Sequence, residues 1–168
     1  LNRFEMQLEA INANLSAADA ASIHADRSAR DRAAAQKALA YVWIGAATER
    51  FWVTILSDLA KELNSLGLNV GQFRASLLAL HEAAGFASLA DLSGLKNWNR
   101  RLHLLDAARA TTLAVFPVEI LPTDGGTVRP AHMELVWSLY GFDGQPFLSP
   151  LHRLALKDLA DGRNDVAH

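Results

Sequence analysis

Three residues near the end of the chain have the side-chain types that cleavage of a phosphodiester bond requires. Arg163 and Asn164 are adjacent, and four residues separate Arg163 from His168. Arginine carries a permanent, planar charge that binds phosphate through two hydrogen bonds, and histidine exchanges a proton near neutral pH. Together they suit phosphodiester chemistry without a metal ion. The spacing alone is close to chance, and Arg74 with His81 forms a similar pair that we interpret as accidental.

The residues before this motif predict the helix that has to position it. Ser149 is a good helix cap and Pro150 a good first-turn residue, so we expect the last helix to begin there. On this helix Asn164 and His168 lie four residues apart and therefore one above the other. Arg163 is rotated from His168 by about 140°. The two side chains can still converge on a groove, particularly one lined by two copies of the helix.

Ordinary structural roles for the motif stay open. Arg163 can pair with Asp161 or Asp165 on the surface, an interaction of little energetic weight. Asp165 also adds a negative charge inside the motif, and Gly162 weakens the helix by roughly 1 kcal/mol relative to alanine. The chain stops at His168 in the middle of a predicted helix and begins with leucine, so we expect it to be part of a longer polypeptide.

Other motifs for metals, cofactors or nucleophilic catalysis are missing from the sequence. Cysteine is absent, which excludes disulfides and thiolate metal sites. No two histidines have the spacing of a helical metal clamp, and Gly125-Gly126 lacks the lysine of a phosphate-binding loop. We therefore expect neither a metal nor a cofactor. The remaining histidines are interpreted as structural or solvent-facing: His24, His81, His103, His132 and His152.

The composition is that of a soluble globular protein with no general affinity for polyanions. Of the 168 residues, 51% are hydrophobic and 20% charged, and the formal net charge is −2. A polyanion would therefore need a local basic patch. The longest apolar stretch, from Ala38 to Leu56, is interrupted by Glu49 and Arg50, which argues against a membrane span. With no signal peptide evident, we expect a cytoplasmic location.

Apolar residues at helical spacing predict one all-α domain over residues 1–168, with about five or six mostly antiparallel helices. Gly67 and Gly85 are expected to end two of them, and a break is expected between residues 25 and 32. Residues 116–130 interrupt the pattern with prolines and glycines, and residues 118–121 are a candidate short strand. The predicted helices lie near residues 4–15, 34–66, 71–84, 95–115, 131–141 and from 150 onward.

The tryptophans fall within these apolar patterns, and we interpret them as core residues rather than as exposed platforms for stacking RNA bases. The helix near residues 95–115 has its apolar positions at Leu95, Trp98, Leu102, Leu105 and Ala108. Arg100, Arg101 and His103 are interpreted as a solvated face rather than as an RNA groove. The tryptophans are Trp43, Trp52, Trp98 and Trp137.

The sequence around the terminal motif resembles the signature of the HEPN (higher eukaryotes and prokaryotes nucleotide-binding) domain family. An amphipathic helix over residues 156–162 leads into Arg-Asn, then an aliphatic residue, a small residue and histidine. Residues 41–51 resemble the aromatic-then-Glu-x-Phe helix of the MAE-like subgroup, and residues 135–142 resemble the short helix that a glycine ends before the last one. The resemblance covers most of residues 34–168 and implies a HEPN-like helical bundle.

The same resemblance implies a metal-independent endoribonuclease. By it, Arg163 stabilises the charged phosphate, His168 is the general acid or base, and Asn164 orients His168 or binds a phosphate oxygen. The 2′-hydroxyl of single-stranded RNA would attack the neighbouring phosphate, at a cleft shared by a homodimer. Such proteins are often toxins of toxin–antitoxin pairs or components of phage defence. The alternative is a catalytically inactive dimerisation module that binds a partner or antitoxin, which the acidic net charge favours.

Overall fold

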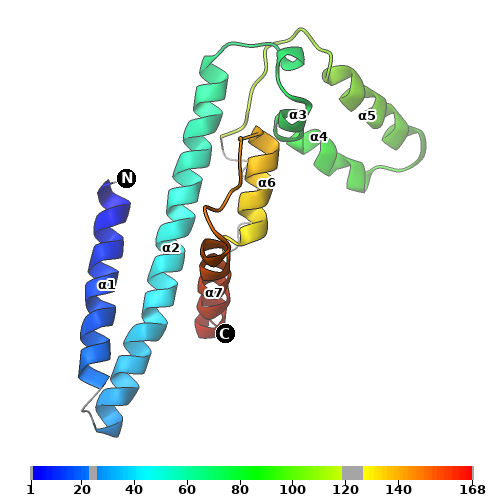
Figure 1. Cartoon of the computed structure of the whole chain (residues 1–168). Coiled ribbons are helices and arrows are strands. Elements are labelled where there is room, and N and C mark those ends of the chain that lie inside the picture. Colours follow the sequence, from blue (N-terminus) through cyan, green and yellow to red (C-terminus); the bar gives the residue numbers. More distant parts are fainter. Residues whose placement is uncertain (1, 23–25, 119–126, 168) are drawn as a thin grey trace. The chain divides into compact units, whose positions relative to one another are not determined.

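The computed structural model describes residues 2–22, 26–118 and 127–167, and the all-α prediction is confirmed for that part of the chain. Its extended segments there form only an isolated β-bridge between Asn69 and Leu113. Seven α-helices occur in these ranges, more than the five or six expected. They are α1 (Asn2–Ser22), α2 (Arg27–Ser65), α3 (Ala75–His81), α4 (Ala83–Ser88), α5 (Gly94–Ala107), α6 (Pro130–Tyr140) and α7 (Pro150–Ala167) (Figure 1).

The chain divides into two compact units. Unit 1 consists of residues 1–53, 125–130 and 147–168, and unit 2 of residues 54–124 and 131–146. Unit 1 therefore contains α1, most of α2 and all of α7. Unit 2 contains the end of α2 and the helices α3 to α6, apart from the first residue of α6.

In unit 1, α1 and α2 run antiparallel as a helical hairpin (Figure 1). Phe4 stacks on Phe51 with ring centroids 4.7 Å apart, and Lys37 pairs with Asp19 at 2.5 Å. Within unit 1, the buried residues of these two helices recur every seven positions, the spacing of a seam between paired helices. They are Ile11 and Ala18 in α1, and Ala33, Ala40 and Ala47 in α2.

The helix α2 begins at Arg27, seven residues before the predicted start at Ala34. Asp26 explains the earlier start, because its carboxylate accepts a 2.8 Å hydrogen bond from the Ala29 backbone N–H, as a helix N-cap does. The helix then runs to Ser65, close to the predicted end. Gly67, at a φ of +60°, follows as expected, since glycine adopts this left-handed conformation without a steric penalty.

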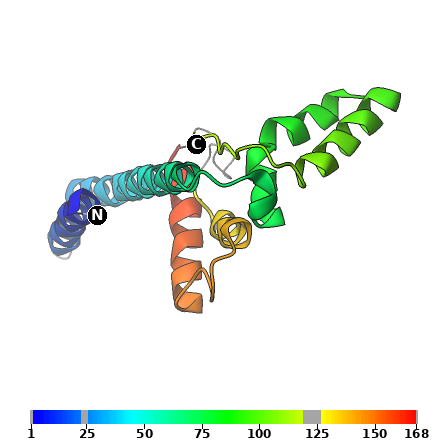
Figure 2. The ribbon, with the colours of Figure 1, turned by 90° about the horizontal axis from the view of Figure 1, so that it is seen from above.

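The helix α7 starts at Pro150, as the sequence predicts, and its C-terminal turns lie against α2 (Figure 2). Ala160 is fully buried. The two helices approach closely through glycine on both sides. The stem of Arg163 crosses Gly45, and the ring of Tyr41 lies against Gly162.

The core of unit 2 forms around an extended segment that the sequence predicts to be helical. The helix α5 ends at Ala107, and the prediction that it continues to Val115 is wrong. The backbone after it pairs with residues 68–71 instead: Val70 N–H donates to Thr112 O, and Ala114 N–H to Leu68 O. The β-branched residues of this segment, Thr111, Thr112 and Val115, favour an extended backbone over a helix. The buried cluster comprises Ala60, Val70, Leu77, Leu80, Ala114 and Phe116.

Two further expectations are corrected, and a third lies almost wholly outside the described residues. Gly85 does not end a helix but lies buried inside α4, and the helix predicted over residues 71–84 is a 3₁₀ turn, η1 (Val70–Gln72), followed by α3 and α4. Trp98 and Trp43 are not core residues, being 62% and 49% exposed. The strand predicted over 118–121 falls outside the described residues except for Val118, which is in a bend.

None of the helices, over the residues that are described, combines the length and apolar character needed to cross a membrane.

Candidate active site

One stripe of the helix α2 faces the C-terminal turns of α7. Tyr41, Gly45 and Glu49 follow one another at intervals of four residues, so they lie along one side of the helix. Each contacts the Gly162–Arg163 pair: Tyr41 touches Gly162, while Gly45 and Glu49 touch Arg163. Two segments that stand more than a hundred residues apart in the sequence therefore meet at Arg163.

Arg163 is held by a carboxylate and a hydroxyl. Its Nη1 lies 2.9 Å from Glu49 Oε1, its Nη2 donates to Glu49 Oε2 at 3.2 Å, and its Nη1 also donates to Thr127 Oγ1. The side chains of Arg163 and Glu49 are each 27% exposed. An ion pair with this little solvent contact is screened less than one on the open surface. Because the guanidinium contacts both Glu49 and Thr127, it is fixed in position, in contrast to an arginine that is free in solvent.

Thr127 links Arg163 to Asn164. Its hydroxyl accepts from Arg163 and donates to Asn164 Oδ1 at 3.2 Å. The structure thus brings two of the three predicted site residues into one hydrogen-bonded network, whereas His168 lies outside the described residues. Thr127 was not predicted, because nothing in its proline- and glycine-rich surroundings distinguishes it. Glu49 lies in a predicted helix, but nothing in the sequence around it indicates that it pairs with Arg163.

The surface pairing of Arg163 with Asp161 that the sequence left open is not found. Asp161 pairs instead with Lys157 Nζ at 2.7 Å and Arg129 Nη1 at 3.0 Å. The hydrogen bonds from Lys157 and Arg129 lower the pKa of the Asp161 carboxyl from its ordinary value, and the bond to Asp161 raises the pKa of Lys157. This pairing holds the 127–130 segment, which carries Thr127, against α7.

Replacing Asp161 with asparagine is expected to lower the free energy of unfolding near neutral pH by a small amount, because the pair is solvent-exposed. A lowered carboxyl pKa stabilises the fold above the unfolded value of about 3.9 and loses this effect as pH falls through the folded pKa. The difference in the free energy of urea unfolding between the wild type and Asp161→Asn should therefore shrink as the pH falls below about 3.9. Asp165→Asn, at an exposed carboxylate on the same helix, is the control for the loss of one negative charge. A difference that stays the same from neutral to acid pH would contradict the ion pair.

Arg74 and His81, the second pair of an arginine and a histidine in the sequence, contact different groups in unit 2. Arg74 donates to Gly141 O at 2.8 Å, whereas His81 Nδ1 lies 2.9 Å from Val115 O and its ring packs edge-on against Phe116. His81 therefore serves packing and backbone contacts. In the part of the chain that is described, no three histidine, aspartate or glutamate side chains gather as metal ligands.

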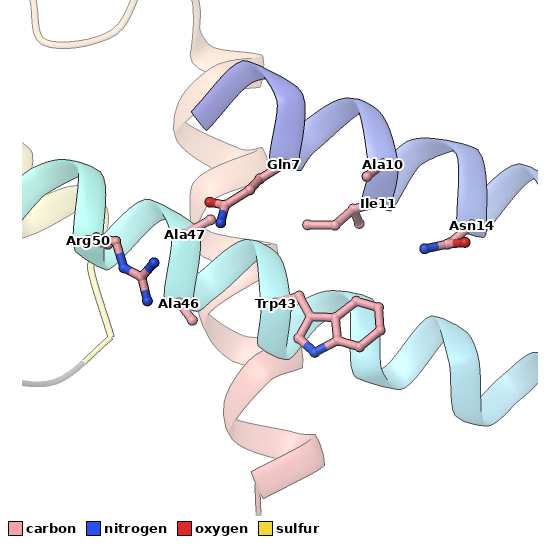
Figure 3. A pocket seen from close by; sticks show the side chains of 8 residues that line it. All are labelled: Gln7, Ala10, Ile11, Asn14, Trp43, Ala46, Ala47 and Arg50. Atoms are coloured by element: carbon pink, nitrogen blue, oxygen red, sulfur yellow. The ribbon is translucent and has the colours of Figure 1, made fainter. Parts of the chain in front are cut away.

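A second feature of unit 1 is an open pocket between α1 and α2, with a volume of about 330 Å³ (Figure 3). The half-exposed Trp43 ring forms one part of its wall, and Arg50 lies about two helical turns further along α2. Gln7 and Asn14 contribute amide groups from α1, which can donate and accept hydrogen bonds. The pocket is lined by Gln7, Ala10, Ile11, Asn14, Trp43, Ala46, Ala47 and Arg50.

Comparison of the chain with protein-family models, with curated proteins and with solved structures finds no match. The chemistry of the site therefore has to be inferred from its own residues. It offers a fixed guanidinium, an adjacent amide and a hydroxyl that links them.

Proposed function

We propose that this chain is a HEPN-type helical bundle and a metal-independent endoribonuclease that acts on single-stranded RNA. The observation that carries the proposal is the fixed position of Arg163 beside Asn164, in a network that joins α7 to α2 and to Thr127. A guanidinium that is already oriented can stabilise charge on a phosphate without first losing conformational freedom.

The contacts of Arg163 leave hydrogen-bond donors for a substrate. Guanidinium has five N–H donors. Glu49 and Thr127 together engage Nη1 and one donor of Nη2. Within the described part of the chain, the Nε–H makes no hydrogen bond. The Nε–H and the second Nη2–H lie on one edge of the planar group, an arrangement that fits two oxygens of a phosphate. Asn164 likewise accepts through Oδ1 and keeps its amide N–H groups as donors.

The proposed reaction is an attack of the ribose 2′-oxygen on the adjacent phosphorus. The new O2′–P bond forms while the P–O5′ bond breaks, which leaves a 2′,3′-cyclic phosphate and a free 5′-hydroxyl. His168 takes the proton of the 2′-hydroxyl or supplies one to the departing 5′-oxygen. A homodimer would provide two histidines, one for each proton transfer. In the cell we place such an enzyme in a toxin–antitoxin pair or in phage defence.

One observation favours a second candidate, a catalytically inactive HEPN-type module that dimerises and binds a partner. Glu49 neutralises Arg163 through contacts to both terminal nitrogens, so the pair has no net charge to offer a phosphate. Glu49 Oε1 is also buried, and its contact with Arg163 lacks the geometry of a good hydrogen bond. On this interpretation the ion pair only joins α2 to α7.

Cleavage of a labelled single-stranded RNA by the full-length protein in EDTA tests the proposal. The wild type should produce cyclic phosphate ends, and RNA with 2′-deoxyribose at the cleaved position should stay intact, because it lacks the attacking group. Arg163→Ala and His168→Ala should each lose the activity. Arg32→Ala, at an exposed arginine of α2 that contacts Ser28, is the matched control and should cleave normally.

The outcomes separate the two candidates. No cleavage by the wild type, in protein that is folded and dimeric, would reject the ribonuclease and favour the partner-binding module. Normal cleavage by both Arg163→Ala and His168→Ala would show that any nuclease activity resides elsewhere.

A further inference from the structure

The helix α5 of unit 2 carries an apolar face that has no cover in the described part of that unit. Leu95, Trp98, Leu102 and Leu105 follow spacings of three, four and three residues. Their side chains are 58% to 76% exposed. This spacing is that of the first and fourth positions of two successive heptads, which form the seam of a two-stranded coiled coil. The exposed residues therefore have the arrangement of a helix pairing with another helix.

The opposite face of α5 is already used within unit 2. Leu104 is 3% exposed, and a Cβ at Gly85 of α4 would lie 2.8 Å from its Cδ2 atom. Asn97 donates to the carbonyl oxygens of Leu89 and Leu92 at 3.0 and 3.1 Å. Because these contacts hold one face of α5 against α4 and the residues before α5, the apolar face on its other side points away from them. Both figures of the ribbon show α5 beside α4 (Figures 1 and 2).

The charged residues beside the apolar face indicate what could bind there. Arg101 and Asp106 occupy the two heptad positions that border the seam, five residues apart. In a parallel pair of α5 helices, Arg101 of each copy would face Asp106 of the other, which gives two complementary ion pairs. An antiparallel pair would instead set the two Arg101 side chains beside each other. Within the described part of the chain, Arg101 lies over the Trp98 ring at 5.0 Å, and neither charge has an ion pair.

We infer that the apolar face of α5 binds a second copy of this chain, through a parallel α5–α5 contact. The contact is separate from the α7 groove of the proposed ribonuclease and does not depend on that function. An RNA ligand fits the face less well, because three of its four apolar residues are leucines, which do not stack on bases as aromatic rings do.

Disulfide cross-linking tests the contact and its direction, and the absence of native cysteine makes the readout specific. In a parallel pair, residue 102 lies opposite residue 102 of the second copy. The full-length Leu102→Cys variant should therefore cross-link on mild oxidation, since a disulfide needs Cα atoms about 4.4–6.8 Å apart. Lys96→Cys, on the outer side of α5, should not. Cross-linking equal at both positions, or at neither, would overturn the inference.

Charge reversal gives an independent test of the same pairing. In the Leu102→Cys background, Arg101→Glu or Asp106→Arg alone should lower the cross-linking rate about tenfold, because each turns two attractions into repulsions. The double variant should recover the rate, and so should an equal mixture of the two single variants. Lys96→Glu changes the charge as Arg101→Glu does but lies off the seam, and should have no effect. A double variant as slow as the single variants would refute the parallel α5–α5 contact.

These results are distinguishable from a failure of the proposed function. Loss of cross-linking with RNA cleavage intact would remove only the α5 contact. Cross-linking without cleavage would leave the contact standing and remove the ribonuclease.

Discussion

Replacing Arg163 with lysine is expected to lower the rate of RNA cleavage about 100-fold or more, which is the usual effect of removing a positioned donor of the transition state. Lysine keeps the positive charge and can still pair with Glu49. Lysine lacks the planar guanidinium. In Arg163 one edge of that group contacts Glu49 and Thr127, and a second edge stays available for phosphate. The rate of a single turnover at saturating RNA measures this loss directly.

Arg32→Lys is the matched control for that measurement. Arg32 is an exposed arginine of α2 that donates to Ser28, so its replacement should change the cleavage rate less than about twofold. Urea unfolding of both variants shows whether the protein in each assay is folded. If Arg163→Lys cleaves as fast as the wild type, the guanidinium geometry has no role in the reaction.

The second large effect is expected at Gly45. A Cβ there would lie 2.7 Å from Arg163 Cδ, closer than real side-chain contacts allow. Gly45→Val must therefore displace the Arg163 stem and with it the contact to Glu49. We expect destabilisation of about 1–3 kcal/mol, the usual cost of overpacking, and a loss of cleavage comparable to that of Arg163→Lys. Urea unfolding and the cleavage assay measure the two effects.

The neighbouring position supplies the control. Ala46 is exposed on the same helix, so Ala46→Val should cost only the difference in helix propensity, about 0.5 kcal/mol. A second comparison isolates the clash. In an Arg163→Ala background the space over Gly45 is open, and Gly45→Ala should stabilise the helix by up to about 1 kcal/mol. Destabilisation by Gly45→Ala in that background would show that something other than Arg163 limits the space.

Features with a local cause could be predicted from the sequence. The start of α7 follows from Ser149 and Pro150, and the end of α2 from Gly67, because capping depends on a few adjacent residues. Arg163 and Asn164 were placed on that last helix for the same reason. The all-α class follows from the repeated spacing of apolar residues along the chain.

Features with a distant cause could not be predicted. Glu49 meets Arg163 across 114 residues, and no local pattern marks such a pair. The end of α5 at Ala107 depends on backbone pairing between residues 110–114 and 68–71, which competes with helix formation only in the folded unit. Periodicity also placed Trp98 on an apolar face, but it does not tell whether that face is covered. The structure leaves it exposed.

The distance in sequence between Glu49 and Arg163 has a consequence for folding. Contacts between residues so far apart form late, because the entropy of closing the intervening loop opposes them until other contacts exist. During translation α2 leaves the ribosome well before α7 is made, and N-terminal elements can fold first. A growing chain therefore holds no assembled Arg163 site until α7 has been made. If the protein is a nuclease, this order keeps the site from forming beside ribosomal and messenger RNA while the segments before α7 are being synthesised.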